Sequence, residues 1–288
     1  MSIMPPLELP DSLVSVAWLR QHLEHDDLII FDASWHMPAT GRDGFREWQQ
    51  EHILGARFFD FDSKIRDPDS DLPHMMPNAE LFTRELQLLG LKQDSVVVVY
   101  DAMGMFSSPR AWWMLRAMGC QRVALLDGGL VAWNEAEYPI ESLAEVPAYP
   151  PGDFIARMDQ ASIADTVEVA AALDDTSVCV LDARPEPRFL GSAEEPRPGL
   201  RRGHMPGALN LPFADVFEHG LLKPKHELRE IIAPLIGDSE RTICSCGSGV
   251  TACVIAFAAE YIGYENLAIY DGSWCEWGLP GELPVVAG

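Results

Sequence analysis

Basic residues are scarce in this chain of 288 residues, which has 21 lysines and arginines against 44 aspartates and glutamates and a formal net charge of −23. A surface so acidic repels the phosphates of nucleic acids and of anionic lipids, so we expect no nucleic-acid partner and no membrane partner. Long apolar runs are also lacking, since none approaches the roughly 18 residues of a membrane-spanning helix. An anionic substrate would therefore need a local cluster of basic side chains.

Cysteine is sparse too, with six residues, and neither a CxxC nor an HxxxH spacing occurs. Six cysteines are too few for a disulfide scaffold, and Met1 to Pro10 has neither the basic nor the apolar part of a secretory signal. We therefore expect a cytoplasmic protein with reduced thiols, no metal ion and no cofactor. Cys120, Cys179 and Cys253 fall in strand or helix contexts and are expected in the core.

A duplication organises the rest of the chain. Two domains are expected at this length, and three segments of the first half recur in the second half in the same order and at nearly the same spacing. The pairs are 29–33 with 180–184, 52–56 with 204–208, and 127–133 with 271–277. Each half therefore repeats one structural unit.

Short apolar runs alternate with helical patterns in both halves, which is typical of parallel sheets covered by helices. The predicted strands are 28–31, 96–100 and 123–126, with counterparts at 178–181, 242–245 and 267–270. One helix is predicted to have Ser108 as its cap, Pro109 in its first turn and Gly119 at its end; its counterpart should start just after Gly249 and end at Gly263. The fold class is therefore α/β.

Prolines and a glycine between the halves, at 139, 147, 150, 151 and 152, resist helix and sheet pairing and indicate a linker. We place the first domain at residues 1–145, the linker at 146–160 and the second domain at 161–288.

The chemistry is expected in the loop 246–251, which joins a predicted strand to a predicted helix, where open α/β sheets bind ligands. Its two glycines allow a tight curl that turns backbone N–H groups toward one point, and the helix N-terminus adds partial positive charge there. A thiolate or persulfide on Cys246 would be stabilised at that point. A cysteine at a strand end is more often a small core residue, but the duplication and the flanking motifs favour catalysis. The loop residues expected to contact the substrate are Gly247, Gly249, Val250 and Thr251.

These features resemble the rhodanese-like sulfurtransferases over nearly the whole chain. The resemblance rests on the tandem halves and on three motifs, Gly-His-x-Pro-Gly-Ala at 203–208, Cys-Gly-Ser-Gly-Val-Thr at 246–251 and Asp-Gly-Ser-Trp at 271–274. It implies two tandem rhodanese-like domains, each a mainly parallel sheet flanked by helices, and a persulfide on Cys246. The chain looks close to the 3-mercaptopyruvate sulfurtransferases in particular, because thiosulfate-using relatives typically carry basic residues where this chain has Gly247 and Ser248.

The resemblance also implies that only the second domain is catalytic. Asp101 stands at the position of Cys246, and a carboxylate cannot form a persulfide. Residues 102–106 are not expected to form a matching curl. The first domain would then serve as scaffold and as one wall of the site.

Carried over residue by residue, the family's substrate-binding roles fall on Arg188 and Arg197. A 2-keto acid presents a planar carboxylate beside a carbonyl, which guanidinium groups bind with paired hydrogen bonds. By contrast, Arg201 and Arg202 are expected to be solvated surface charges.

The resemblance further implies a proton relay of Ser248, His74 and Asp62, the last two matching first-domain positions across the cleft from the cysteine. On its own residues, His74 would be an ordinary loop histidine. His52 and His204 occupy equivalent places in the two repeats, so they are expected to serve a shared structural turn.

The implied reaction has two halves. Cys246 takes sulfur from 3-mercaptopyruvate, a 2-keto acid thiol, and leaves the enolate of pyruvate, whose charge Arg188 and Arg197 would hold. An acceptor then attacks the outer sulfur; cyanide, a small thiol or a reduced thioredoxin-like protein would serve.

Three other interpretations stay open. A thiosulfate:cyanide sulfurtransferase would use the same cysteine. A non-catalytic binding module of the same fold is reasonable for the first domain because of Asp101. A phosphatase with a Cys-x5 loop would need an arginine where Ala252 stands.

Two further cysteines lie near the loop in sequence. Cys244 precedes Cys246 by two residues, but strand geometry usually separates such sulfurs too far for a disulfide. Cys275 replaces the hydroxyl residue usual in the family. A resolving thiol and a simple substitute for serine are both compatible with the sequence there.

Overall fold

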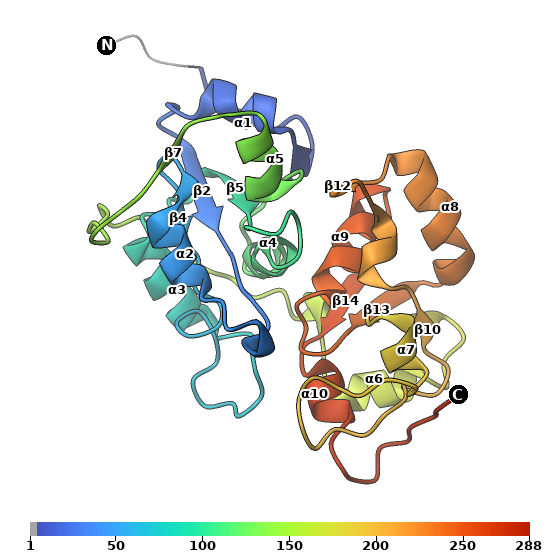
Figure 1. The fold of residues 1–288 in the computed structure, drawn as a ribbon. Helices are drawn as coiled ribbons and strands as arrows, with labels where there is room; N and C mark the ends of the chain where they lie inside the picture. The colour runs from blue at the N-terminus through green and yellow to red at the C-terminus, as the bar shows by residue number, and fades with distance from the viewer. Residues whose placement is uncertain (1–4) are drawn as a thin grey trace. The chain divides into compact units, whose positions relative to one another are not determined.

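The structure, a computed structural model, describes residues 5–288. The chain divides into two compact units, the first formed by residues up to Arg66 together with Pro77–Met158 and the second by Asp67–Met76 together with Asp159–Gly288. Segment 67–76 therefore packs with the second unit although it comes from the first half of the chain. Each unit is an α/β domain (Figure 1).

The first unit is built on a five-stranded parallel sheet with the order β1-β6-β5-β2-β4. A short antiparallel pair, β3 with β7, lies outside it. The strands are β1 (Leu13–Val14), β2 (Leu28–Asp32), β3 (His52–Ile53), β4 (Arg57–Phe58), β5 (Val96–Tyr100), β6 (Val123–Leu126) and β7 (Ile140–Glu141). The helices are α1 (Val16–His22), the 3-10 helix η1 (Pro38–Thr40), α2 (Gly44–Gln50), α3 (Ala79–Leu88), α4 (Ser108–Ala117) and α5 (Gly129–Glu135).

The second unit repeats this sheet, with the order β10-β9-β13-β14-β8 and all neighbours parallel. Its strands are β8 (Ile163–Ala164), β9 (Val178–Asp182), β10 (Leu209–Asn210), β13 (Arg241–Ser245) and β14 (Leu267–Tyr270), and a separate antiparallel pair is formed by β11 (Phe217–Glu218) and β12 (Leu221–Leu222). Its helices are η2 (Gln160–Ser162), α6 (Thr166–Ala172), α7 (Glu186–Phe189), η3 (Phe213–Val216), α8 (Lys225–Ile236), α9 (Ala252–Tyr261) and α10 (Ser273–Trp277). All six predicted strands are present, and the α/β class is confirmed.

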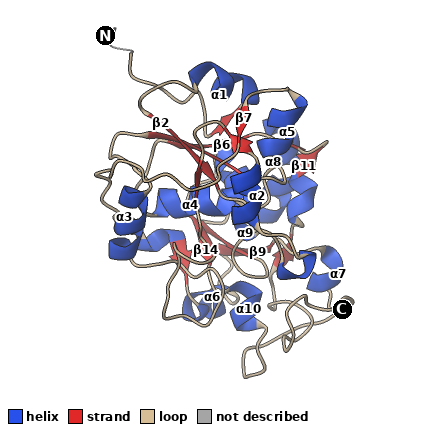
Figure 2. Ribbon diagram, turned by 60° about the vertical axis from the view of Figure 1, so that its left-hand side comes forward, coloured by secondary structure: helices blue, strands red, loops and turns tan. Residues whose placement is uncertain are grey.

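Both faces of each sheet are covered, which is why its strands are apolar throughout. Along β5, Val98 and Tyr100 belong to the core that α1 and α5 cover. Successive strand residues point to opposite faces, so the residues between them face α4, which packs against β5 and β6. In the second unit α8 and α9 lie on one side of the sheet, and α6 and α10 lie on the other (Figure 2).

The start of α4 differs from the prediction by one residue. Ser107, not Ser108, is the cap, and its hydroxyl donates to the Ala33 carbonyl instead of accepting from the helix. The counterpart helix α9 begins at Ala252, after the cap Thr251, and the chain beyond it turns at Gly263, whose φ is 103°.

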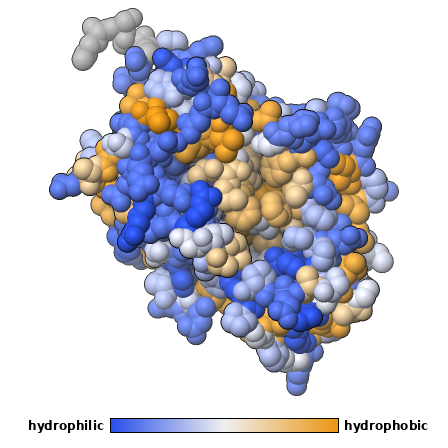
Figure 3. All heavy atoms as spheres, viewed as in Figure 1, coloured by the Kyte–Doolittle hydropathy of each residue, from blue (hydrophilic) through white to orange (hydrophobic). Residues whose placement is uncertain are grey.

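Hydrophilic side chains cover much of the face seen in Figure 3, as expected from the acidic composition, and apolar patches interrupt them. Among residues 5–288, no helix is both long and apolar enough to cross a bilayer, and the longest, α8, has 12 residues.

Candidate active site

Cys246 lies at the carboxyl end of the second sheet, directly after β13, whose last residue Ser245 pairs with Asp182. Its side chain is buried, with 2% of the residue exposed. The curl 246–251 leads into α9. The strand, loop and helix therefore follow one another as predicted.

The Ser273 side chain stabilises this curl by accepting hydrogen bonds from two of its amides. The sequence did not reveal this role. The Ser273 hydroxyl accepts the N–H of Cys246 at 3.2 Å and of Gly249 at 3.1 Å, and donates to the Tyr270 carbonyl at 2.7 Å. The Ser273 backbone is left-handed, with φ of 49°, so this turn is a strained conformation held in place by its contacts. The Gly249 amide, predicted to contact the substrate, is thus directed to Ser273.

Two backbone hydrogen bonds continue the contact between the loop and α10. The N–H of Trp274 donates to the Cys246 carbonyl at 3.0 Å, and the N–H of Cys275 donates to the Gly247 carbonyl at 2.9 Å. Within the described residues, the remaining loop amides have no acceptor; these are the N–H groups of Gly247, Ser248, Val250 and Thr251. A buried N–H without a partner is costly, so the loop is prepared for an added acceptor.

The first unit shows what such a loop does with an anion. Asp101 follows β5, whose last residue Tyr100 pairs with Asp32, just as Cys246 follows the residue paired with Asp182. Its carboxylate accepts three backbone N–H groups, from Met103 at 2.8 Å, Ser107 at 2.9 Å and Ser108 at 2.7 Å. The loop after Asp101 thus gathers amides around an anion, although its sequence does not indicate a matching curl.

Arg188 lies against the cysteine loop. A Cβ atom placed on Gly247 would stand 3.1 Å from Arg188 Nη2, so a side chain at this position would displace the guanidinium. Glu195 holds Arg188 by hydrogen bonds to Nε at 3.1 Å and Nη2 at 2.5 Å, and holds Arg184 Nη1 at 2.8 Å. Glu195, whose side chain is only 2% exposed, is a positioning residue that no sequence motif indicated.

Arg197 is partly buried and lies near Cys275. Burial raises the pKa of the Cys275 thiol to about 11, while the positive charges of Arg197 and Arg188 act in the opposite direction and the charges of Cys246 and Glu195 add to it. These interactions bring both predicted arginines, the cysteine loop and Cys275 into one neighbourhood.

His74 is buried, with a left-handed backbone at φ of 62°, in segment 67–76. The N–H of Met76 donates to Asp271 Oδ2 at 2.6 Å, which fastens this segment to the turn that carries Ser273. His74 therefore belongs to the same unit as Cys246 and Ser248. Asp62 is exposed in the first unit.

Burial keeps Cys120, Cys179 and Cys244 as thiols at neutral pH. Burial raises the pKa of Cys120 to about 12 and of Cys179 to about 11, and it raises the pKa of Cys244 well above its usual range. Cys120, Cys179 and Cys253 are buried, which confirms their place in the core.

Three predicted surface or turn residues can also be placed. Arg201 is not a solvated charge, because its guanidinium donates to the carbonyls of Leu283 and Trp277, both at 2.7 Å. His52 and His204 each form a hydrogen bond to a backbone carbonyl through Nδ1. The partner of His52 is Trp48, at 2.5 Å, and the partner of His204 is Phe189, at 2.8 Å.

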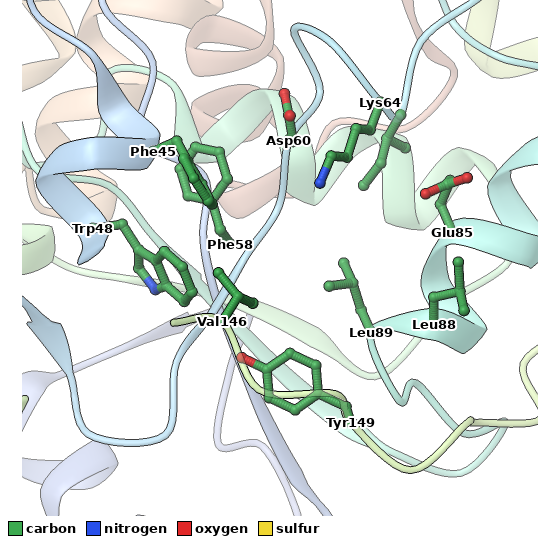
Figure 4. A pocket seen from close by; sticks show the side chains of 11 residues that line it. Phe45, Trp48, Phe58, Asp60, Lys64, Glu85, Leu88, Leu89, Val146 and Tyr149 are labelled. Carbon is green, nitrogen blue, oxygen red and sulfur yellow. The ribbon is translucent and has the colours of Figure 1, made fainter. Parts of the chain in front are cut away.

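Two pockets of the first unit share Trp48 in their linings. One of ≈ 200 Å³ has aromatic and aliphatic walls with Asp60, Lys64 and Glu85 at its rim (Figure 4). The other, of ≈ 340 Å³, lies at the carboxyl end of the sheet, with Asp32 and Ala102 in its lining. In the described part of the chain, no cluster of three or more His, Cys, Asp or Glu residues could hold a metal ion.

Comparison with known proteins agrees with the fold of the two units. The family profile "Rhodanese-like domain" matches residues 15–136 and again 165–279. The human 3-mercaptopyruvate sulfurtransferase is 41% identical over 278 residues, which cover 94% of this chain and 93% of that protein. Thiosulfate/3-mercaptopyruvate sulfurtransferase 1, mitochondrial, of Arabidopsis thaliana is 38% identical over 302 residues, covering 96% and 78%. The crystal structure of a 3-mercaptopyruvate sulfotransferase from Escherichia coli superposes with a TM-score of 0.83 at 36% identity and covers 92% of this chain and 99% of that one.

Proposed function

Because this chain belongs to the rhodanese family, we propose that it is a sulfurtransferase that takes sulfur from 3-mercaptopyruvate as a persulfide on Cys246 and releases pyruvate. The name carried by the human and bacterial relatives supports this donor. The geometry around Gly247 supports it further, since the site's positive charge comes from Arg188 beside the loop and not from a basic residue within it.

The observation that carries the proposal is the anion held at the equivalent point of the first unit. Three N–H groups converge there on the Asp101 carboxylate. In the second unit a sulfur atom replaces the carboxylate, and four loop amides are without an acceptor. The same arrangement would stabilise a thiolate or persulfide of Cys246 through hydrogen bonds to the anion.

In the first half-reaction, the Cys246 thiolate attacks the substrate sulfur and the carbon–sulfur bond breaks. The electron pair goes to the carbon skeleton as the enolate of pyruvate. Arg188 and Arg197 hold the substrate carboxylate and the enolate oxygen, where charge develops during the step. Glu195 fixes the direction of the Arg188 guanidinium and so preorganises it.

Proton transfer falls to Ser248 and His74, both in the second unit, which would take the substrate thiol proton and return one to the enolate carbon. Asp62 stays a prediction from the sequence. In the second half-reaction cyanide, a small thiol or a reduced thioredoxin-like protein attacks the outer sulfur and regenerates the Cys246 thiolate.

We further propose that the first domain is non-catalytic, because the only group at its loop position is the Asp101 carboxylate. The domain limits at 145 and 161 and the cytoplasmic location stay predictions from the sequence. The Arabidopsis relative is named mitochondrial.

Thiosulfate is the alternative donor, since the Arabidopsis relative is named for both donors. Measuring kcat/KM for each donor with cyanide as the acceptor decides between them. We expect a clear preference for 3-mercaptopyruvate in the wild type and no turnover of either donor by Cys246→Ser. A preference for thiosulfate would overturn the assignment of the donor.

A further inference from the structure

The pocket of ≈ 340 Å³ in the first unit lies where the first sheet presents the carboxyl ends of its strands. Its volume is within the range of small-molecule sites, roughly 300–1,000 Å³. Its lining includes Asp32, Ser34 and Leu130, all within the first unit.

These three residues correspond to three residues of the second unit. Asp32 and Asp182 each end the strand beside the central one. In each unit the residue two positions later donates its N–H to that carboxylate. Ser34 donates to Asp32 at 2.8 Å, and Arg184 donates to Asp182 at 2.9 Å.

Leu130 corresponds to Trp274 by the same kind of contact. The N–H of Leu130 donates to the Asp101 carbonyl, and the N–H of Trp274 donates to the Cys246 carbonyl, both at 3.0 Å. Asp101 and Cys246 each follow the central strand of their own sheet.

In the second unit this place is filled by the chain itself. The Arg184 guanidinium is fully buried, forms an ion pair with Asp182 at 2.6 Å and lies over the Trp274 ring, with 4.0 Å between Cζ and the ring centroid. The carboxylate and the aromatic face together bind a planar cation.

In the first unit both large side chains are replaced by smaller ones, serine for arginine and leucine for tryptophan, and both replacements line the pocket. The Asp32 carboxylate remains, with 1% of the residue exposed. It accepts hydrogen bonds from Ser34 and from the Tyr100 side chain, but among the described residues no arginine, lysine or histidine forms an ion pair with it. A buried carboxylate without a cation is costly, so a cation that enters the pocket is favoured.

We propose that the first unit binds a small guanidinium compound in this pocket, with the cation on the Asp32 carboxylate in the position that the Arg184 guanidinium takes in the second unit. Burial supports this, since it raises the pKa of Asp32 to about 7 in the absence of a cation. The other charged groups of the lining have partners of their own: Glu47 binds Arg42 and His36, and Glu51 accepts from Asn134.

The test is a titration of the isotope-labelled full-length protein with methylguanidinium, followed at the Ser34 amide, which donates to Asp32. We expect a saturable shift with a dissociation constant in the millimolar range, as for any ligand of so few heavy atoms. Methylurea, which has the same planar shape and no charge, is the matched control and should give no saturable shift. The absence of saturation with methylguanidinium, or equal binding of methylurea, would overturn the proposal.

Two variants test the location. Ser34→Arg places a guanidinium on the chain as in the second unit, and Leu130→Trp refills the pocket while leaving Asp32 in place. Each should weaken methylguanidinium binding at least about tenfold, or about 1.4 kcal/mol. Ser34→Arg also removes the acceptor of the Ala102 N–H. If Ser34→Arg does not fold, the binding measured with Leu130→Trp tests the location. Unchanged binding in a folded variant would contradict the assignment of this pocket.

Discussion

The N–H of Ser108 donates to the Asp101 carboxylate at 2.7 Å, at the start of the helix that follows the central strand of the first unit. At the position that Cys246 takes in the second unit, the first unit has a carboxyl group that accepts three amides of its own loop. Asp101 and Cys246 thus occupy the same point of their units, directly after the central strand of the sheet.

Asp101→Asn removes the charge from the side chain that accepts hydrogen bonds from three backbone amides. We expect the first unit to lose about 1–3 kcal/mol of unfolding free energy, since these hydrogen bonds are charge-assisted. Urea unfolding with probes in each unit measures this loss. Asp94→Asn, at an exposed position of the same unit, is the control and should stay within about 0.5 kcal/mol of the wild type. Equal stability of both variants would mean that Asp101 contributes nothing.

Removing the Ser273 hydroxyl leaves the Cys246 and Gly249 amides without their acceptor. Ser273→Ala keeps the backbone strain the same, so the change isolates these hydrogen bonds. We expect kcat to fall about tenfold or more, because each lost buried hydrogen bond costs about 1–3 kcal/mol and the curl would loosen. Ser239→Ala, outside the site, is the control. An unchanged kcat would show that the curl does not need Ser273.

Arg188→Lys keeps the charge and loses the planar fork that binds a carboxylate in pairs. We expect kcat/KM for 3-mercaptopyruvate to fall by roughly 10- to 100-fold, the equivalent of about 1.5–3 kcal/mol for hydrogen bonds to charged groups. Arg202→Lys, at an exposed arginine paired with Glu194, should change little. Equal effects in the two variants would argue against substrate binding by Arg188.

The Asp32 carboxyl makes the stability of the first unit depend on pH. Its pKa rises from 3.8 in the unfolded chain to about 7 in the fold because of burial. Between these values the folded state binds more protons than the unfolded one, so stability falls as the pH rises through this range and is level above it.

Asp32→Asn should remove that dependence. The unfolding free energy of the wild type minus that of the variant should fall by on the order of 4 kcal/mol from about pH 4 to above pH 7. Urea unfolding at a series of pH values measures this difference. A difference that does not change with pH would contradict a raised pKa of the buried Asp32 carboxyl.

The sequence predicted the six strands and the position of the cysteine loop, because both follow from short-range patterns and from the duplication. It did not predict that Ser273 and Glu195 position the site. Both act through hydrogen bonds to residues of another segment, which only the folded chain brings together. Arg201 was misjudged for the same reason, as its partners lie about 80 residues away. The attachment of segment 67–76 to the second unit is likewise a tertiary contact. The pocket at Asp32 could have been found, because the repeats align Asp-Ala-Ser at 32–34 with Asp-Ala-Arg at 182–184.

The most direct measurement is the mass of the peptide that contains Cys246 after the protein has reacted with 3-mercaptopyruvate in the absence of an acceptor. We expect a gain of one sulfur atom on that peptide, which cyanide removes and which Cys246→Ser lacks. An unmodified Cys246 peptide, or the added sulfur on Cys244 or Cys275 instead, would contradict it.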